Sequence, residues 1–222
     1  MNISKDTLSI LQNFSEINPS LVFNEGSELK TMSPLKNILA KTSVTENFPR
    51  QFGIYDLTNF VNNIQTMGTP DFDFTETHVT LKNTNEDKLK YFYCDPSIIT
   101  SPEKDIDLDD ITIEFSVSKT EFDKVIKYAR ANNLQDFMIK GCSKSNKIIF
   151  SVFNKSTDTS TDFSTVIGAT DKNFKLFLKI ETIKLLSGDY DVKVSTKGVV
   201  YFKNQNIDLE YWVALEPDSK YE

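Results

Sequence analysis

The chain has few of the residues on which metal and phosphate chemistry depends. Its 222 residues include one histidine, two cysteines and seven glycines. Cys94 and Cys142 follow neither a CxxC nor a Cys/His spacing, so the sequence carries no zinc signature. The glycines form neither a phosphate-binding loop nor a nucleophile elbow, and His78 is expected to be a surface side chain. We therefore expect no enzymatic activity, no catalytic residue, no metal and no cofactor.

Long apolar runs are also missing. A membrane-spanning helix needs about 18 or more consecutive apolar residues, and no such stretch occurs. Lys5, Asp6 and Glu16 interrupt the N-terminal region, where a signal peptide would need a continuous apolar core. We therefore expect a cytoplasmic protein that does not contact a membrane and whose cysteines are free thiols.

Aromatic residues are abundant instead. Hydrophobic residues make up 39% of the chain, with 17 Phe and 8 Tyr, so the chain can bury a substantial core. The net charge of -7 and the pI near 4.9 would argue against nucleic-acid binding if charge were spread evenly. The distribution of basic residues must therefore be examined before the net charge is used to argue against nucleic-acid binding.

The two halves of the sequence repeat each other, with matching segments in the same order. The pairs are 4–8 with 118–122, 20–26 with 135–141, 53–57 with 177–180, 68–74 with 188–194, and 89–92 with 209–212. We predict two homologous α+β domains, each with two helices on antiparallel sheets. The domains span residues 1–95 and 111–222. Residues 96–110 form an extended connector, because they contain Pro96 and Pro102 and lack a helical period.

The helix predicted from about residue 120 to 132 has opposite apolar and basic faces. Its apolar face has residues at helical spacing, namely Phe122, Val125, Ile126 and Ala129. Lys124 and Lys127 lie on the opposite face, and Arg130 lies at the flank, from which its long side chain can reach the same side. On a single helix such a face is ordinarily only solvated, but repeated helices around one surface would form a basic ring.

The other predicted helices are less basic. The first has an apolar stripe of Ile3, Ile10, Leu11, Phe14 and Ile17. Lys5 faces away from this stripe, and the helix that begins at Asp56 has neither lysine nor arginine. A last helix, predicted from Lys179 to Leu186 in spite of a poor amphipathic pattern, adds Lys179 and Lys184.

Several segments, in order and spacing, resemble the sliding clamps of T-even-type bacteriophages. They are Asn13-Phe14, Ile17-Asn18, Ile54-Tyr55-Asp56-Leu57, Asp95-Pro96-Ser97, Gly188-Asp189-Tyr190 and Val213-Ala214-Leu215-Glu216-Pro217-Asp218-Ser219. The resemblance spans nearly the whole chain. It implies the fold of proliferating cell nuclear antigen (PCNA), in which a homotrimeric ring of outer strands has helices lining its hole.

The resemblance also implies a function and a set of partners. The ring encircles duplex DNA without sequence preference and tethers the replicative DNA polymerase in the cytoplasm of the infected bacterial host. An ATP-dependent clamp loader places it on DNA, and late-transcription sigma-like and co-activator proteins are further expected partners. The residues expected to face DNA are Lys5, Lys124, Lys127, Arg130, Lys179 and Lys184. Gln12 departs from the family, which has a basic residue there.

Two further surfaces are expected from the resemblance. The trimer interface would pair the run from Leu89 to Tyr93 with the run from Phe174 to Leu178 of a neighbouring chain. Its expected residues are Leu89, Tyr91, Tyr93, Phe174, Leu176 and Leu178. The hydrophobic pocket for partner peptides would be formed by Ile98, Ile99, Pro102, Leu215 and Pro217. The alternative is a clamp-fold interaction scaffold that does not encircle DNA.

Overall fold

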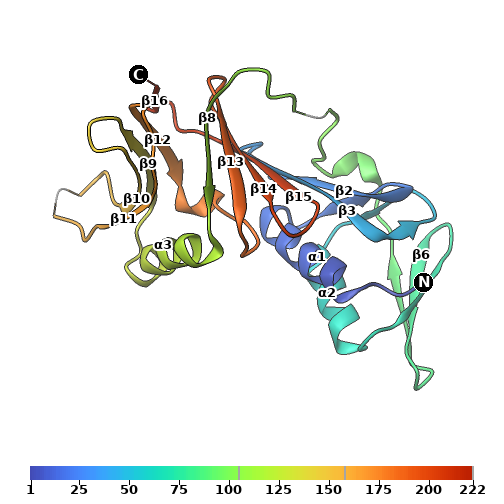
Figure 1. The fold of residues 1–222 in the computed structure, drawn as a ribbon. Helices are drawn as coiled ribbons and strands as arrows, with labels where there is room; N and C mark the ends of the chain where they lie inside the picture. The colour runs from blue at the N-terminus through green and yellow to red at the C-terminus, as the bar shows by residue number, and fades with distance from the viewer. Residues whose placement is uncertain (105, 158, 222) are drawn as a thin grey trace. The chain divides into compact units, whose positions relative to one another are not determined.

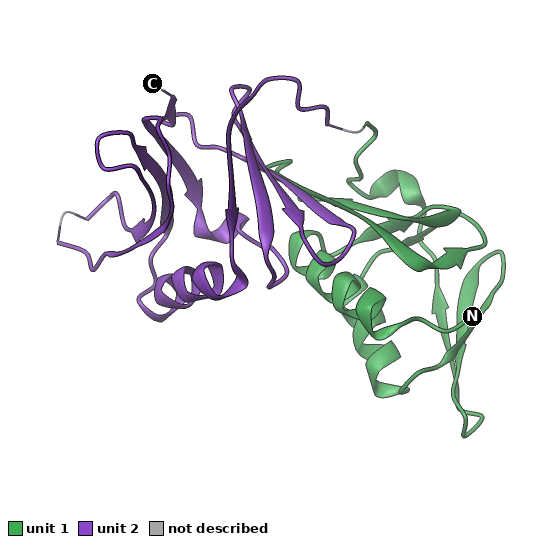
Figure 2. Ribbon diagram, in the orientation of Figure 1, with its two compact units in different colours: residues 1–105 green, residues 106–222 purple. Residues whose placement is uncertain are grey.

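The computed structural model describes residues 1–104, 106–157 and 159–221. The chain divides into two compact units at residue 105 (Figure 2). The division falls inside the predicted connector, whose residue 105 lies outside the described residues, as does residue 222 of the predicted second domain. Each unit combines helix with antiparallel strands, so the α+β prediction is confirmed for both.

Unit 1 contains two α-helices and three separate groups of strands (Figure 1). Its elements are α1 (Lys5–Ile17), β1 (Leu21–Phe23), β2 (Gly26–Met32), β3 (Ile38–Phe48), β4 (Phe52–Ile54), α2 (Leu57–Thr66), β5 (Asp71–Phe74), β6 (His78–Lys82), β7 (Lys88–Phe92) and the 3-10 turn η1 (Pro96–Ile98). Strand β1 pairs with β4, β2 pairs with β3, and β5, β6 and β7 form a meander in that order.

The two helices of unit 1 begin at side-chain caps and bury one face each. The Thr7 N–H donates to Ser4 Oγ, and the Asn59 N–H donates to Asp56 Oδ1 at 2.9 Å, which satisfies free amides at each helix start. The predicted apolar stripe of α1 is buried. Helices α1 and α2 pack side by side over an aromatic cluster, in which Phe23 stacks on Phe52 with ring centroids 4.7 Å apart.

Unit 2 contains one α-helix and two antiparallel groups of strands. Its elements are β8 (Ile111–Val117), α3 (Lys119–Ala131), β9 (Asp136–Cys142), β10 (Lys147–Phe153), β11 (Phe163–Gly168), β12 (Phe174–Lys179), the 3-10 turn η2 (Ile180–Thr182), β13 (Tyr190–Ser195), β14 (Val199–Asn204), β15 (Leu209–Ala214) and β16 (Lys220–Tyr221). One group has the order β11-β10-β9-β12-β16. In the other, β14 pairs with β15 and β13, and β13 pairs with β8.

The prediction of a helix from Lys179 to Leu186 is wrong. Strand β12 continues to Lys179, and only Ile180–Thr182 turns, as a 3-10 segment without a side-chain cap. Two buried tyrosines hydrogen-bond to the backbone of Leu186 instead. The Leu186 N–H donates to the Tyr211 hydroxyl at 3.1 Å, and the Tyr190 hydroxyl donates to the Leu186 carbonyl. A segment this short cannot form a stable helix without caps, so its backbone conformation is set by the hydrogen bonds to the two tyrosines.

Candidate nucleic-acid interface and partner surfaces

Helix α3 is fixed at its start by a reciprocal cap and along its length by one apolar face. The Glu121 N–H donates to Ser118 Oγ at 3.3 Å, while the Ser118 N–H donates to Glu121 Oε2 at 3.1 Å. The four residues predicted for the apolar face are the buried residues of the helix: Phe122, Val125, Ile126 and Ala129. The predicted basic face therefore lies in solvent, with Lys124, Lys127 and Arg130 exposed.

The three cations of α3 that are predicted to face DNA differ in how tightly they are held. Lys124 Nζ lies 5.5 Å from the centroid of the Phe163 ring, on which the Tyr128 ring also stacks at 4.0 Å. No described residue forms an ion pair or side-chain hydrogen bond with Lys127 or Arg130. Both stand near the C-terminal end of the helix, where the macrodipole favours positive charge. Their charges are thus available to an anionic ligand.

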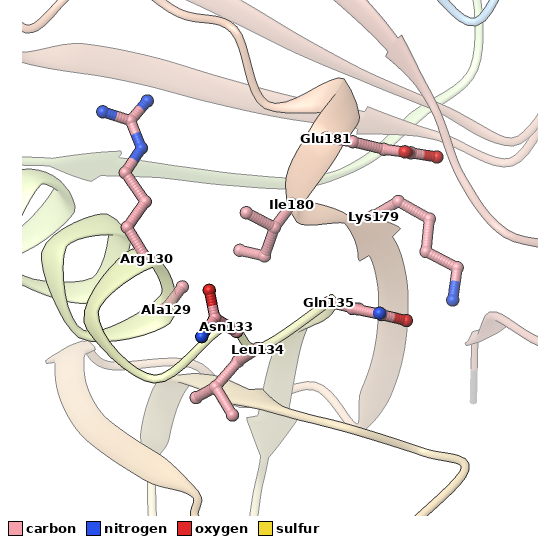
Figure 3. A pocket seen from close by; sticks show the side chains of 8 residues that line it. All are labelled: Ala129, Arg130, Asn133, Leu134, Gln135, Lys179, Ile180 and Glu181. Atoms are coloured by element: carbon pink, nitrogen blue, oxygen red, sulfur yellow. The ribbon is translucent and has the colours of Figure 1, made fainter.

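A cavity of about 550 Å³ lies beyond the end of α3 (Figure 3). Arg130 and Lys179, both predicted to face DNA, line it from different elements and point in different directions. Lys179 Nζ binds Asp136 Oδ1 at 2.5 Å, and the Asp136 side chain is only 5% exposed. The hydrogen bond to Asp136 raises the Lys179 pKa and stabilises the charged pair. Most of the positive charge of Lys179 is therefore neutralised within unit 2.

The remaining predicted cations lie in different settings. Lys5 is exposed in the first turn of α1, where no described residue pairs with it. A cation at this helix end is opposed by the helix dipole, so helix stability does not explain it. Lys184 follows η2 in an extended segment and is half-buried, so it does not lie on a helical face as predicted.

The outer surface of the unit 1 helices is rich in amides, which a pattern of basic residues in the sequence does not reveal. Gln12, Asn59, Asn62 and Gln65 are exposed on α1 and α2. Gln65 Nε2 lies 3.4 Å from Gln12 Oε1, so an amide pair bridges the two helices. Amides donate hydrogen bonds to phosphate without a net charge.

The predicted peptide-pocket residues belong to two separate units. In unit 1, Ile98 is 61% exposed, whereas Ile99 is 8% exposed and packs near Gly53. Pro102 is half-buried. In unit 2, Leu215 is half-buried and Pro217 is exposed. Ile98 is thus the one large apolar side chain of this set that protrudes fully into solvent.

The predicted interface strands have unlike environments. Leu89 and Tyr91 lie half-buried on β7, which pairs with β6 on one edge only among the described strands. Tyr93 follows β7 and its ring stacks on Phe52 at 4.8 Å. In contrast, Phe174, Leu176 and Leu178 are at most 2% exposed, in the core of unit 2.

Strand β12, which carries these three buried residues, has both of its edges occupied. It pairs with β9 along one edge and with β16 along part of the other. Ser219 and Glu216 hydrogen-bond to the backbone of Phe177 beyond that point. The described strands at the two ends of this sheet are β11, with 6 residues, and β16, with 2, so β11 offers the longer unpaired edge.

Within the described residues, His, Cys, Asp and Glu side chains form no group that could hold a metal ion. Cys94 and Cys142 are free thiols. His78 Nδ1 lies 3.0 Å from the Thr75 hydroxyl, and its ring lies against Phe92. None of the described helices is long and apolar enough to cross a membrane.

The fold is that of the PCNA-type DNA clamps. The PCNA of A. fulgidus, solved with the C-terminal region of FEN-1, superposes with a TM-score of 0.71 at 14% identity, over 96% of each chain. The PCNA of Thermococcus kodakaraensis superposes with a TM-score of 0.68 at 14% identity, again over 96% of each chain. At such identities the likeness defines the fold alone.

Sequence comparison shows that the chain is similar to the sliding clamps of phages. The chain is 28% identical to the sliding clamp of Vibrio phage KVP40, over 97% of this chain and 99% of the relative. It is 23% identical to the sliding clamps of Escherichia phage RB69 and Enterobacteria phage T4, over the full length of each. No family model matches the sequence. The predicted resemblance to the sliding clamps of T-even-type phages is thus confirmed over the whole chain.

Proposed function

We propose that this chain is a DNA sliding clamp, which encircles duplex DNA as a homotrimer and acts as a processivity factor for the replicative DNA polymerase. The observation that carries the proposal is the full-length similarity to three phage sliding clamps together with the PCNA-type fold. Neither the sequence nor the geometry of the described residues offers a set of groups for catalysis.

The basic face of α3 supports the DNA part of the proposal. Lys124, Lys127 and Arg130 are long, exposed side chains that can reach phosphates without reading bases. Such contacts hold any sequence equally well and let the protein move along the duplex. Lys5 is the matching cation of unit 1, and the amides of α1 and α2 add uncharged donors. Lys179 and Lys184 are weaker candidates for contact with DNA, because neither lies on a helical face.

The strand edges support a head-to-tail ring. An unpaired edge is prone to pair with another chain, and the described strands that end a sheet include β7 in unit 1 and β11 in unit 2. We assign the interface to these two strands, keeping Leu89, Tyr91 and Tyr93 and replacing the β12 residues with β11. A contact between unlike edges closes into a ring when its rotation is a whole fraction of a turn.

Exposed apolar side chains near the connector support a role in binding partner peptides. Ile98 protrudes from η1, and we assign it as the anchor point for a short hydrophobic peptide, with Ile99 and Pro102 close to it in the sequence. Leu215 and Pro217 are the corresponding residues to test in unit 2. The polymerase, the clamp loader and the late-transcription sigma-like and co-activator proteins are the partners to be tested for this contact.

The decisive experiment measures topological retention on DNA. Mass would first be determined by light scattering over a dilution series. The protein would then be loaded on nicked circular DNA with the cognate loader and ATP and passed through a gel-filtration column. We expect a trimer that stays with circles at high salt and is released when a restriction enzyme linearises them. A monomer, or a protein released equally from both forms of DNA, would favour the scaffold without encirclement.

A further inference from the structure

Three lysines form a row across the outward face of the five-stranded sheet of unit 2. Lys140 on β9 stands directly opposite Lys175 on β12, which stands directly opposite Lys220 on β16. Directly opposite residues point to the same side of an antiparallel sheet, and like charges there weaken strand pairing. The inward neighbours Ile139 and Leu176 are buried, so the lysine row faces outward. Sheet stability does not explain the lysine row.

Among the described residues, the lysine row has no counter-charge. No described residue forms an ion pair or side-chain hydrogen bond with any of the three lysines. Unit 1 provides the contrast, because Lys30 and Lys41 also stand directly opposite each other on β2 and β3. There, one carboxylate of Glu28 binds both ammonium groups, at 2.8 and 3.0 Å. In unit 1, a shared carboxylate thus offsets the repulsion between two opposed lysines.

A small cavity lies at the lysine row. Its volume is about 260 Å³, and all three lysines line it together with Cys142 and Asn173. This volume is large enough for a side-chain carboxylate. The next outward pair is Met138 opposite Phe177, both half-buried, and the Lys155 ammonium lies 3.5 Å from the centroid of the Phe177 ring.

The lysine row is also held in place before any ligand arrives. Strand β16 carries Lys220 and is short, but contacts on both sides of it fix its position. The Phe177 N–H donates to Ser219 Oγ at 2.9 Å, and the Tyr221 hydroxyl donates to the Ser195 carbonyl at 2.9 Å. Such preorganisation reduces the entropy lost on binding.

We propose that the lysine row is a docking site for an acidic segment of a partner protein, whose carboxylates take the place that Glu28 holds in unit 1. A glutamate or aspartate side chain can enter the cavity and contact two lysines at once, while an adjacent apolar residue contacts Met138. The proposal rests on unit 2 alone and stands whether or not the chain encircles DNA.

The test uses a fluorescein-labelled peptide of eight glutamates and the full-length protein. Lys175→Glu is the key variant, because a carboxylate at the centre of the lysine row can pair with Lys140 and Lys220. We expect it to weaken peptide binding at least tenfold and to raise the melting temperature. Lys36→Glu, a change of equal charge in an exposed turn of unit 1, should do neither. Carbodiimide cross-linking should join the peptide to Lys140, Lys175 or Lys220 of the unmodified protein.

Three outcomes would overturn the proposal. One is equal loss of peptide binding in Lys175→Glu and Lys36→Glu, which would indicate a general effect of net charge. Another is cross-linking that maps away from the lysine row. The last is a single-stranded oligonucleotide that binds more tightly than the peptide and loses its affinity in Lys175→Glu, which would make the lysine row a nucleic-acid site.

Discussion

At the level of single residues, the sequence predicts which side chains of a helix face the core more reliably than it predicts ion pairs. The apolar positions of α1 and α3 follow from helical spacing, and the structure buries all of them. Glu46 could not be placed in this way. Its carboxylate on β3 accepts a hydrogen bond from the Thr7 hydroxyl at 2.6 Å and another from the backbone N–H of Ser4. Both partners are far away in the sequence. Only the tertiary fold creates this contact.

The Asp136–Lys179 pair gives a prediction for pH. Burial of the Asp136 carboxyl raises its pKa, but hydrogen bonds from Lys179 and the Lys155 N–H outweigh burial, so that the pKa lies below its ordinary value. A carboxyl with a lowered pKa contributes stability above its unfolded pKa of about 3.9, and this contribution is lost as pH falls through the folded value. Asp136→Asn should therefore lower the free energy of unfolding by about 1–2 kcal/mol at pH 7.

This difference should shrink as the pH falls below about 4, because the wild-type carboxyl then becomes protonated as well. Urea titrations at pH 7 and at several acidic values would measure it. Asp73→Asn is the matched control, since Asp73 forms an exposed pair with Lys82 at 2.8 Å, and it should change the curve little. A difference for Asp136→Asn that stays constant with pH would contradict the assignment.

The exposed cations of α3 give a prediction for DNA binding. Replacement of Lys127 and Arg130 by glutamine removes two charges that no described residue pairs with. The slope of log K against log salt for a linear duplex should fall by about 0.9 for each phosphate that the variant no longer neutralises, with no change in sequence preference. Fluorescence anisotropy over a range of salt concentrations measures this slope. The double variant Lys36→Gln, Lys104→Gln should leave it unchanged, and an equal effect in both would refute a specific role for α3.

At the level of elements, the internal repeat predicts strands well and fails at one helix. Recurrent segments correctly indicate α1 and α3, the strands that follow them and the paired strands near the end of each unit. The repeat also implies a second helix in unit 2, and the structure has η2 instead. Because Tyr190 and Tyr211 satisfy the backbone of Leu186 from other strands, the segment after β12 departs from its counterpart in unit 1.

The same limit explains the interface strands. The sequence alternates at Phe174, Leu176 and Leu178, as expected for a strand with one buried face. This alternation is the same whether the edge of the strand is free or paired. Only the strand order reveals that β12 is flanked on both sides and that β11 is not. Edge position is a property of the sheet and has no local sequence signature.

The edge strands give a prediction for assembly. Val166 is 49% exposed on β11, and Phe92 is 66% exposed on β7. A lysine at either position places a charge on the edge and should oppose pairing between chains without disturbing the core. Val166→Lys and Phe92→Lys should shift the trimer toward monomer by at least tenfold in dissociation constant, as measured by sedimentation. Leu35→Lys, at an 81% exposed position outside both strands, is the control and should assemble normally.

At the level of the whole molecule, the acidic composition concealed local basic surfaces. The net charge of -7 predicts solubility and says little about any one face. The basic face of α3 was evident from helical spacing, whereas the lysine row emerged only from the register of β9, β12 and β16. Whole-chain composition thus indicated only which functions not to expect. The placement of charge within each unit indicated the candidate binding surfaces.

Assembly should also be visible in thermal stability. If the chain folds as a trimer, its melting temperature depends on protein concentration by mass action. A hundredfold dilution should lower it by about 5 °C for a chain of this size. Differential scanning fluorimetry at several concentrations would measure the shift, and Val166→Lys should abolish it. A melting temperature independent of concentration in the unmodified protein would argue against the trimer.

The unlike edges of β7 and β11 have a consequence for how such a ring meets its partners. When every contact joins one kind of edge to the other, all chains point the same way around the ring, and no two-fold axis can exchange its top and bottom. The two flat sides then present different loops and different side chains. A ring of this kind carries an inherent polarity, so a bound enzyme placed on one side always faces the same direction of travel.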